Sequence, residues 1–449
     1  MDGMSIERAA LACGGELCGV KDPKRELGRV IIDSRAVQPG DLFAAFKGEK
    51  ADGHDYIAAA IEKGAACCLA ERLPEGVSGP VLRVRNAQTA LEQIAEAYRE
   101  TLSIPVVGIT GSVGKTSAKE MIATVLSKRF RVLKTEGNLN NQLGVPMTLS
   151  RITKEHEAAV VEMGISGFGE MRVLSRIAKP TLGVFTVIGH AHLEYLHDLN
   201  GVLRAKTEML ENMAEDAPIV VNGDDALLRT FPCRQKKLTF GLEDGNLLRA
   251  VDIAQTASGT RCRIVGLGHE IAAEIPAFGK HMVYAALEGA AVGILLGMED
   301  AEIAAGIRCF EIVGRRAAVC KTGCLTLVDD SYNANPDSVK CGVDSLLTLP
   351  GRHVCILGDM LELGEDSAQM HFDVGRYAAD QGADLVLSSG EYAAALIEGA
   401  GEKGKSFASV EALIAALPTL LQKGDAVLVK ASRGARFERV SEAIKELTL

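Results

Sequence analysis

Residues 108–117 read GITGSVGKTS and directly follow an apolar run. A buried strand that leads into a glycine-rich loop, followed by a Lys-Thr pair that opens a helix, is typical of proteins that hold a nucleoside triphosphate. Gly111 and Gly114 have no Cβ, so the backbone can turn sharply and direct several N–H groups at phosphate oxygens. Lys115 is expected to reach the β- and γ-phosphates, and the Thr116 hydroxyl to bind Mg²⁺.

This loop, called the P-loop below, departs from the usual GxxxxGK[ST] pattern because Ile109 stands where glycine is expected. The short pattern GxxGKT also occurs by chance in ordinary loops. Its place between a strand and a helix favours nucleotide binding. We therefore predict that the phosphates of ATP contact Gly111, Ser112, Val113, Gly114, Lys115, Thr116 and Ser117.

Composition indicates an ordinary cytoplasmic enzyme. A chain of 449 residues is long enough for two to four domains, and its net charge of -10 argues against a nucleic-acid-binding surface. No uncharged apolar run approaches the roughly 20 residues of a membrane helix, and the N-terminal MDGMSIERAA lacks the apolar core of a signal peptide. The 11 cysteines show no CxxC spacing, which favours free thiols in a reducing cytosol. We expect no membrane insertion, and a monomer is the default.

The order of expected strands and helices predicts an α/β protein of three domains. The boundaries are placed at residues 1–85, 86–314 and 315–449, called the N-terminal, middle and C-terminal segments below. In the middle segment strands alternate with helix-length pieces, which favours a doubly wound, mostly parallel sheet with ligands at the carboxyl ends of the strands. A Rossmann-like arrangement is expected in the C-terminal segment. The expected middle-segment elements are strands 106–109, 159–163, 182–188 and 219–222, and a helix over 115–129.

Glu162 stands at the end of a buried strand in VVEMG. A carboxylate in such a place is costly unless it is paired or bound to a cation. Mg²⁺ prefers oxygen ligands and is often held by one carboxylate together with substrate phosphates. Glu162 is therefore a candidate magnesium ligand, and the alternative is a carboxylate that caps a helix.

The segment IGHAHLEYLH brings several metal-binding residue types together. His190 and His192 alternate along the chain, so both face one side of an extended backbone. A dinuclear zinc hydrolase would show the pattern HxHxDH, which fails here because Glu194 and Tyr195 occupy the last pair. The alternative for His190 and His197 is an ordinary solvent-facing histidine.

The motifs ITGSVGKTS, EGNLNNQLGVPMTL, VVEMG, GHAHLEYL, RAKTEML and VNGDD, in this order, resemble the Mur ligase family of peptidoglycan precursor synthesis. DSRAVQPGDLFAAFKGEKADGHDYI near the start, DDSYNANPDSV at 329–339 and ILGDMLELGEDS at 356–367 resemble the branch that adds D-alanyl-D-alanine. The DNPR-type motif of the sibling that adds the third residue is missing. The resemblance implies that ATP and UDP-MurNAc-tripeptide form an acyl phosphate, which D-Ala-D-Ala converts to the pentapeptide, ADP and phosphate.

The resemblance also implies roles for particular residues. The catalytic group would be Lys115, Glu162, His192 and Lys206. Thr116 would bind one Mg²⁺, while Glu162, His192 and a carbamylated Lys206 would hold a second. A lysine on a helix is otherwise usually solvated.

Further contacts are implied on both sides of the P-loop. The nucleotide would contact His281, Arg315, Asp330, Asn333 and Asn335, with Arg316 as an equally plain alternative to Arg315 and a simple turn as the alternative for NANP. The UDP-sugar and peptide, bound mainly by the N-terminal segment, would contact Ser34, Arg35, Lys47, Asn138, Asn140, Asn141 and Arg433. Arg35 or Lys47 could equally form a surface ion pair.

The family pattern GxHNVxNALAA is altered here to GKHMVYAALEG at 279–289. Met282 and Ala285 replace asparagines, so the adenine contact must differ. Three functions compete: the D-Ala-D-Ala ligase, a sibling or folylpolyglutamate-type ligase, and a nucleotide-dependent regulatory switch. A switch has no need for Glu162, His192 and Lys206 together. The sequence leaves open whether the third peptide residue is lysine or meso-diaminopimelate, and we expect hinge closure around the reaction.

Overall fold

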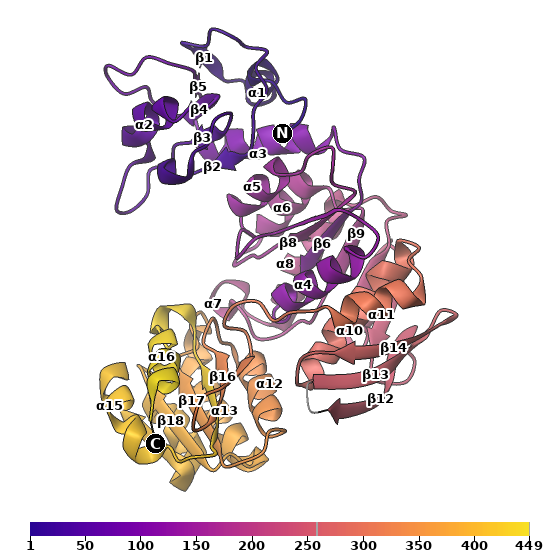
Figure 1. Ribbon diagram of the computed structural model, residues 1–449, viewed down its shortest axis with the longest axis vertical. Coiled ribbons are helices and arrows are strands. Elements are labelled where there is room, and N and C mark those ends of the chain that lie inside the picture. Colours follow the sequence, from indigo (N-terminus) through magenta and orange to yellow (C-terminus); the bar gives the residue numbers. More distant parts are fainter. Residues whose placement is uncertain (257–258, 449) are drawn as a thin grey trace.

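The computed structural model describes residues 1–256 and 259–448. It contains a five-stranded, a nine-stranded and a six-stranded sheet, and each sheet lies within one of the three segments (Figure 1). The predicted α/β class with mostly parallel sheets is confirmed. No helix in the described ranges is both long and apolar enough to cross a membrane.

The N-terminal sheet has the order β1-β5-β4-β3-β2, and only β1 runs antiparallel to its neighbour. Its strands are short. Helix α1 is capped at its start, where the Ser5 side chain accepts a hydrogen bond from the Arg8 N–H. Its elements are α1 (Ile6–Cys13), β1 (Glu16–Cys18), β2 (Val30–Ile31), β3 (Leu42–Ala44), α2 (Ile57–Glu62), β4 (Cys67–Ala70) and β5 (Val81–Arg83).

Helix α3 (Ala87–Arg99) joins the N-terminal sheet to the middle segment. The buried Tyr98 hydroxyl donates to the Ile152 carbonyl oxygen at 2.5 Å, and the Val30 N–H donates to Ser150 Oγ at 2.9 Å. One continuous hydrophobic core runs from Met1 into the middle segment. The N-terminal sheet is therefore packed onto the middle segment rather than tethered to it.

The middle sheet has the order β14-β13-β12-β11-β10-β9-β6-β8-β7. The strands from β7 to β12 pair in parallel, whereas β12, β13 and β14 form an antiparallel extension that the sequence did not predict. The strands are β6 (Val106–Thr110), β7 (Val132–Lys134), β8 (Ala158–Glu162), β9 (Leu182–Phe185), β10 (Ile219–Asn222), β11 (Lys237–Gly241), β12 (Leu248–Thr256), β13 (Gly259–Gly266) and β14 (His269–Ile275).

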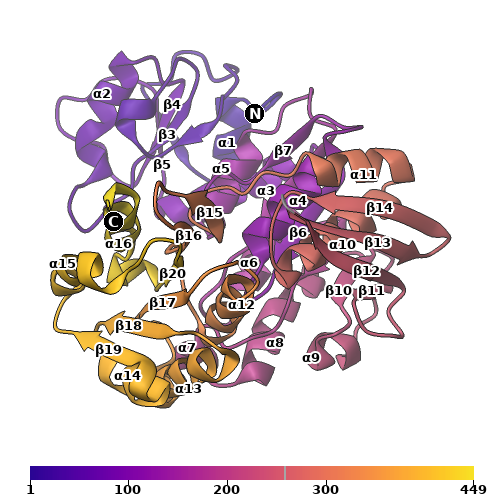
Figure 2. The same ribbon diagram turned by 60° about the horizontal axis from the view of Figure 1, so that its bottom comes forward.

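Helices cover both faces of this sheet (Figures 1 and 2). Helix α4 follows the P-loop and packs against α10, so the nucleotide motif is fixed to the centre of the segment. The helices are α4 (Lys115–Leu126), α5 (Gly144–Ser150), α6 (Glu170–Ala178), α7 (Leu193–Leu196), α8 (Leu199–Thr207), α9 (Ala226–Thr230), α10 (Lys280–Leu295) and α11 (Asp300–Arg308).

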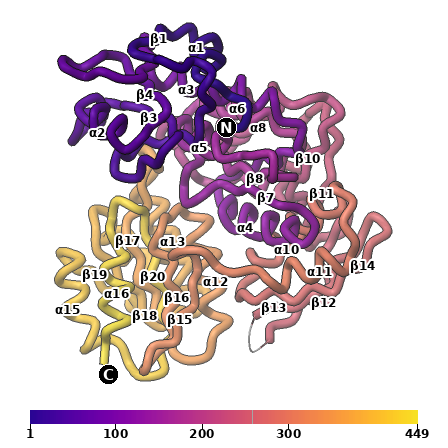
Figure 3. The backbone as a smooth tube through the Cα atoms, turned by 45° about the horizontal axis from the view of Figure 1, so that its top comes forward, coloured from indigo at the N-terminus to yellow at the C-terminus, as the bar shows by residue number. Residues whose placement is uncertain are grey.

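The C-terminal sheet has the order β15-β16-β20-β17-β18-β19, and only β15 is antiparallel. The chain crosses to it from α11, as the tube in Figure 3 shows. Its elements are β15 (Ala318–Lys321), β16 (Thr326–Asp330), α12 (Pro336–Leu346), β17 (His353–Gly358), α13 (Ser367–Gln381), β18 (Leu385–Ser389), α14 (Ala393–Ala400), β19 (Gly404–Phe407), α15 (Val410–Leu420), β20 (Ala426–Lys430) and α16 (Glu438–Glu446).

Candidate active site

The P-loop lies between β6 and α4, as predicted. Gly111 has φ +153°, and a Cβ there would lie 1.9 Å from Thr186 Oγ1, so only glycine fits. Gly114, with φ +87°, precedes α4. Lys115 Nζ donates to the Gly111 carbonyl oxygen at 2.6 Å, and burial lowers the pKa of this lysine. The loop is therefore a tight, preformed turn that holds its lysine at the amino end of α4.

The chain after β9 is tied to the P-loop. The Ser112 N–H donates to the Val187 carbonyl oxygen at 2.8 Å, and Ser112 Oγ accepts from the Gly189 N–H at 2.9 Å. The expected strand 182–188 therefore ends early, at Phe185, because the following residues contact the P-loop instead of a neighbouring strand.

Glu162 meets two other candidates at the end of β8. Its carboxylate accepts a hydrogen bond from Thr116 Oγ1 at 3.0 Å and another from Asn140 Nδ2 at 2.8 Å, and its side chain is buried. Strand pairing explains this, since Ile109 on β6 is opposite Glu162 on β8. A hydroxyl and a carboxylate oxygen are the donors that Mg²⁺ prefers, so this pair fits one ion whose other ligands are water and phosphate.

Two charged residues of α4 that the sequence analysis missed complete this cluster. Lys119 Nζ, almost fully buried, lies 3.1 Å from Glu120 Oε1 and 3.7 Å from Glu162 Oε2. Glu120 also pairs with Lys134. The signal was present in KTSAKE, because a residue three positions after Thr116 lies on the same face of the helix.

Lys206 lies on α8 with only 1% of its surface exposed. Its Nζ makes no hydrogen bond or ion pair with any residue in the described ranges. Burial lowers its pKa well below the usual value, and the charge of Lys115 lowers it further. Lys206 is therefore a buried, unpaired amine close enough to the P-loop lysine to sense its charge.

The two histidines after β9 contact the C-terminal segment. The Nδ1–H of His192 donates to Glu362 Oε2 at 2.5 Å, and this bond holds the pKa of Glu362 below its usual value. His190 donates from its backbone N–H to Asp337 Oδ2 at 2.6 Å and from Nδ1 at 3.0 Å. Within residues 1–256 and 259–448, no group of three or more His, Cys, Asp or Glu side chains is placed to hold a metal ion.

Two of the predicted nucleotide residues of the C-terminal segment, Asp330 and Asn333, are joined through Lys430. Lys430 Nζ, almost fully buried, donates to Asp330 Oδ2 at 2.5 Å and to the Asn333 carbonyl oxygen at 2.9 Å. The Asn333 side chain is exposed. Asn335 instead caps α12, because its side chain accepts from the Ser338 N–H at 2.8 Å. That cap is a structural role for the NANP turn.

His281, at the start of α10, faces this network. Its Nδ1 lies 3.4 Å from Ser345 Oγ on α12. Burial lowers the pKa of His281, the nearby carboxylate of Asp330 opposes that shift, and Lys430 adds to it. The middle and C-terminal segments therefore meet at this histidine as well.

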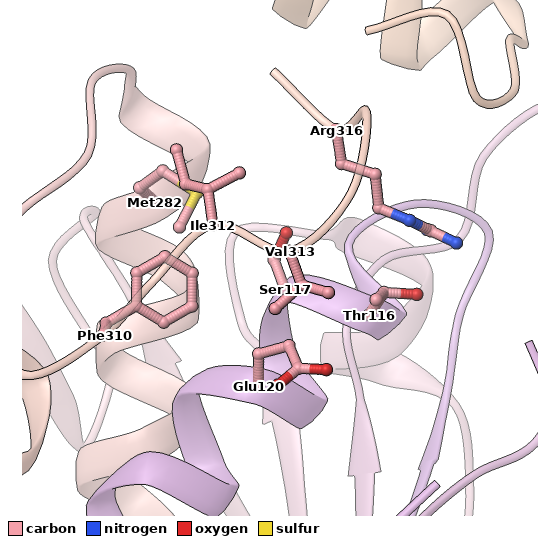
Figure 4. Close-up of a pocket in the computed structure, with 8 residues that line it drawn as sticks. All are labelled: Thr116, Ser117, Glu120, Met282, Phe310, Ile312, Val313 and Arg316. Atoms are coloured by element: carbon pink, nitrogen blue, oxygen red, sulfur yellow. The ribbon is translucent and has the colours of Figure 1, made fainter. Parts of the chain in front are cut away.

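Of the two neighbouring arginines, Arg316 is the one at the P-loop. The Arg315 guanidinium lies 2.6 Å from Glu442 Oε1, within the C-terminal segment. The Arg316 guanidinium stacks 4.1 Å from the centre of the Tyr332 ring, with Arg433 at 5.2 Å from the same ring. Figure 4 shows Arg316 extending toward Thr116.

The pocket in Figure 4 joins the first turns of α4 to the linker between α11 and β15. Met282, one of the two positions altered from the family pattern, lies in its wall, whereas Ala285 does not. The lining combines a polar edge near the P-loop with an apolar wall. Its residues are Thr116, Ser117, Glu120, Met282, Phe310, Ile312, Val313 and Arg316.

The substrate candidates of the N-terminal segment remain on its surface. Arg35 pairs with Asp33 at 2.7 Å, which is the ion pair that the sequence left as the alternative. Lys63 donates to the Ser34 carbonyl oxygen at 2.9 Å, and Lys47 is exposed. Within residues 1–256 and 259–448, these side chains make no hydrogen bond or ion pair with the P-loop.

The three asparagines of GNLNN lie in different environments. Asn140 bonds to Glu162, whereas Asn141 accepts from the Gly144 N–H at 2.9 Å at the start of α5. Asn138 is exposed. Only Asn140 therefore belongs to the cluster around the P-loop, and the other two roles stay predictions.

These features define a ligase-type P-loop enzyme with an α/β segment on either side. Family models match in all three segments: "Mur ligase family, catalytic domain" at residues 27–99, "Mur ligase middle domain" at 109–293, and "Mur ligase, glutamate ligase domain" at 310–433. The chain belongs to the Mur ligase family, which confirms the resemblance seen in its motifs.

Several relatives match over nearly their whole length. The UDP-N-acetylmuramoyl-tripeptide--D-alanyl-D-alanine ligase of Bacillus subtilis is 34% identical, with 99% of each chain covered. The Escherichia coli enzyme of the same name is 36% identical, with 94% of each covered. Among solved structures, MurF from Acinetobacter baumannii superposes with a TM-score of 0.90 at 30% identity, with 99% of each chain covered. MurF ligase from Thermotoga maritima in complex with ADP superposes with a TM-score of 0.83 at 29% sequence identity, with 93% of this chain and 97% of that chain covered.

Proposed function

We propose that the chain uses ATP to join D-alanyl-D-alanine to UDP-N-acetylmuramoyl-tripeptide, giving the pentapeptide precursor of peptidoglycan. The observation that carries the proposal is the P-loop cluster of Lys115, Thr116 and Glu162, in a chain matched end to end by ligases of that name. ADP in the solved Thermotoga relative supports ATP as the energy source.

The chemistry needs a better leaving group than oxide. A carboxylate oxygen of the tripeptide attacks the γ-phosphorus, the bond to the β-γ bridging oxygen breaks, and ADP leaves. The amine of D-Ala-D-Ala then attacks the acyl carbon, loses a proton, and phosphate departs with the former carboxylate oxygen. The protein contributes mainly orientation and charge stabilisation to such a phosphoryl transfer. Lys115 is placed to offset charge on the transferring group.

Thr116 and Glu162 are the residues proposed to hold Mg²⁺. Their oxygen atoms are the ligands that Mg²⁺ prefers. Because Glu162 is buried, a bound cation would offset the cost of keeping its carboxylate charged. When bound, Mg²⁺ neutralises phosphate charge. His192, which lies on the chain after β9, is proposed as a ligand of a second Mg²⁺.

Lys206 is proposed to be carbamylated. Its buried amine has a strongly lowered pKa and no described partner, so the neutral form with a free lone pair is favoured. That lone pair can attack carbon dioxide, and loss of a proton leaves a carbamate anion. The change replaces a neutral amine beside Lys115 with an oxygen-bearing anion suited to the second Mg²⁺.

The C-terminal segment is proposed to close over the nucleotide. Arg316 is the arginine that we assign to the phosphates, because it lies beside Thr116 while Arg315 is paired elsewhere. Asp330 and Asn333 are proposed to contact the nucleoside. Closure would exclude water from the acyl phosphate.

The N-terminal segment is proposed to bind the UDP-sugar, with Ser34, Arg35 and Lys47 as contacts. Arg35 would exchange its pairing with Asp33 for the pyrophosphate. We further propose a cytoplasmic monomer. All 11 cysteines are free thiols, which agrees with a reducing compartment.

A ligation assay tests the function. The enzyme is mixed with ATP, Mg²⁺, UDP-MurNAc-tripeptide and D-Ala-D-Ala, and phosphate release and product mass are followed. We expect phosphate release to require both substrates, and the product to gain one dipeptide. Glu162→Gln should abolish turnover, whereas Glu157→Gln, an exposed carboxylate at the other end of β8, should not. Ligation of a single amino acid in place of the dipeptide would refute the proposal.

A further inference from the structure

An unassigned carboxylate holds His192. Glu362 follows β17 in the C-terminal segment, and its Oε2 accepts the Nδ1–H of His192 at 2.5 Å. Its backbone carbonyl oxygen also accepts the Glu194 N–H at 3.2 Å. His192 and Glu362 have positive φ angles of 56° and 63°, a backbone conformation that residues other than glycine rarely adopt. Two loops from different segments are thus held together at two points.

The histidine loop is also fixed to the P-loop. Gly189, three residues before His192, exchanges hydrogen bonds with the Ser112 side chain, donating at 2.9 Å and accepting at 3.0 Å. Helix α7 starts directly after His192 and lies against the C-terminal segment in both views (Figures 1 and 2). His192 therefore stands at a junction between the P-loop and the C-terminal segment.

We propose that Glu362 is a positioning residue that fixes the ring of His192 with Nδ1 protonated, leaving the Nε2 lone pair for the magnesium and phosphate site. This inference rests on the proposed metal-binding role of His192. Because Glu362 belongs to the C-terminal segment, His192 is oriented only while that segment is docked. Glu362 therefore links the orientation of His192 to the docking of the C-terminal segment.

The physical reason lies in the chemistry of imidazole. A neutral ring carries one N–H, and the hydrogen bond that this group makes decides which nitrogen stays free to bind a metal. A carboxylate only accepts, so Glu362 selects the form with the proton on Nδ1. Carboxylate partners of this kind are worth about 10- to 100-fold in metal affinity.

The neighbouring histidine offers a matched control. His190 makes its own bonds across the same junction, to Asp337. Glu362→Ala and Asp337→Ala each remove one carboxylate–histidine contact between the segments. Only the first removes the partner of His192. Loss of docking alone would affect the two variants alike.

The first test needs neither metal nor turnover. Histidine-¹⁵N-labelled protein is examined by NMR at about pH 8, where an ordinary imidazole is neutral, and the His192 signal is assigned with His192→Gln. We expect the Nδ1–H form in the parent protein and in Asp337→Ala, and a shift toward the Nε2–H form in Glu362→Ala. An unchanged His192 signal in Glu362→Ala would overturn the inference.

The second test measures the Mg²⁺ dependence of ligation. We expect Glu362→Ala to raise the apparent Mg²⁺ activation constant about tenfold, with kcat recovering at saturating Mg²⁺. Glu362→Gln, whose amide oxygen can still accept from Nδ1, should recover part of that loss, and Asp337→Ala should leave the constant unchanged. Equal constants in the Glu362→Ala and Asp337→Ala variants would overturn the inference. Full activity of His192→Ala would instead remove the proposed role of His192 itself.

Discussion

The P-loop face of the middle segment and the face that the C-terminal segment turns toward it are built differently. Thr116 and Glu162 are buried and held by strand order. Across the junction, the side-chain contacts include His190–Asp337, His192–Glu362 and His281–Ser345, and the side chains of the first two pairs are partly exposed. One face is preformed, and it is the face to which we assign phosphate and metal. The other includes ion pairs between partly exposed side chains, and it is the surface at which we propose closure.

The largest effect is expected on the preformed face. Lys115→Ala should lower kcat about a thousandfold, because one preorganised charge is lost where charge develops in the transition state. Lys128 is exposed and lies just after the end of α4, so Lys128→Ala should leave kcat near the parent value. Steady-state phosphate release measures both. A Lys115→Ala enzyme with parental kcat would show that the P-loop lysine does not act on the phosphoryl group.

Lys206→Ala should cost about a hundredfold in kcat, because the metal site loses its proposed anion. Short carboxylic acids added to the variant should restore part of the activity, since they can supply the missing carboxylate. The exposed Arg204 on the same helix provides the control variant Arg204→Ala. Parental activity of Lys206→Ala without added acid would contradict carbamylation.

A pH effect follows from the lowered pKa of Lys206. The carbamate forms from the neutral amine and reverts when the amine is protonated. Activity at limiting carbon dioxide should therefore fall as the pH is lowered through the pKa of this amine, and added bicarbonate should oppose the fall. Initial rates measured at each pH with and without added bicarbonate test this. A rate insensitive to bicarbonate at every pH would count against the modification.

The two arginines of the linker allow a comparison between the faces. Arg316→Ala should raise the KM for ATP about tenfold, whereas Arg315→Ala should change it less than about threefold, because a charge-assisted contact to phosphate is worth more than an exposed ion pair. The opposite ranking would return the phosphate contact to Arg315, as the family pattern suggested.

The smallest effect tests the packing of the N-terminal sheet. Tyr98→Phe removes a buried hydroxyl that donates to the Ile152 carbonyl oxygen and should lower the free energy of unfolding by about 1–2 kcal/mol. Urea denaturation measures this, with Tyr56→Phe, at an exposed ring, as the control. Equal stability of both variants would mean that this bond does not hold α3 on the middle segment.

The sequence predicted the preformed face well because its determinants are local. The P-loop, the buried strand before it and the strand that ends at Glu162 each carry their own pattern, and parallel pairing then brings Thr116 and Glu162 together. The antiparallel extension β12–β14 was not predicted, although alternate residues of β14 are buried and apolar.

The junction was harder to predict for a physical reason. Glu362 lies 170 residues from His192, so nothing local marks them as partners. Arg315 and Arg316 are adjacent in a bend and chemically alike, so no local pattern tells which of them faces the P-loop. Only the tertiary contacts with Glu442 and Tyr332 separate them.

The central claim, ligation through an acyl phosphate, can be tested with an oxygen label. UDP-MurNAc-tripeptide labelled with ¹⁸O in its reacting carboxylate is converted with ATP and D-Ala-D-Ala, and the released phosphate is analysed by mass spectrometry. The account predicts that one labelled oxygen is transferred to the phosphate, because the attacking carboxylate oxygen leaves with it. Product formation with unlabelled phosphate would contradict the acyl-phosphate route.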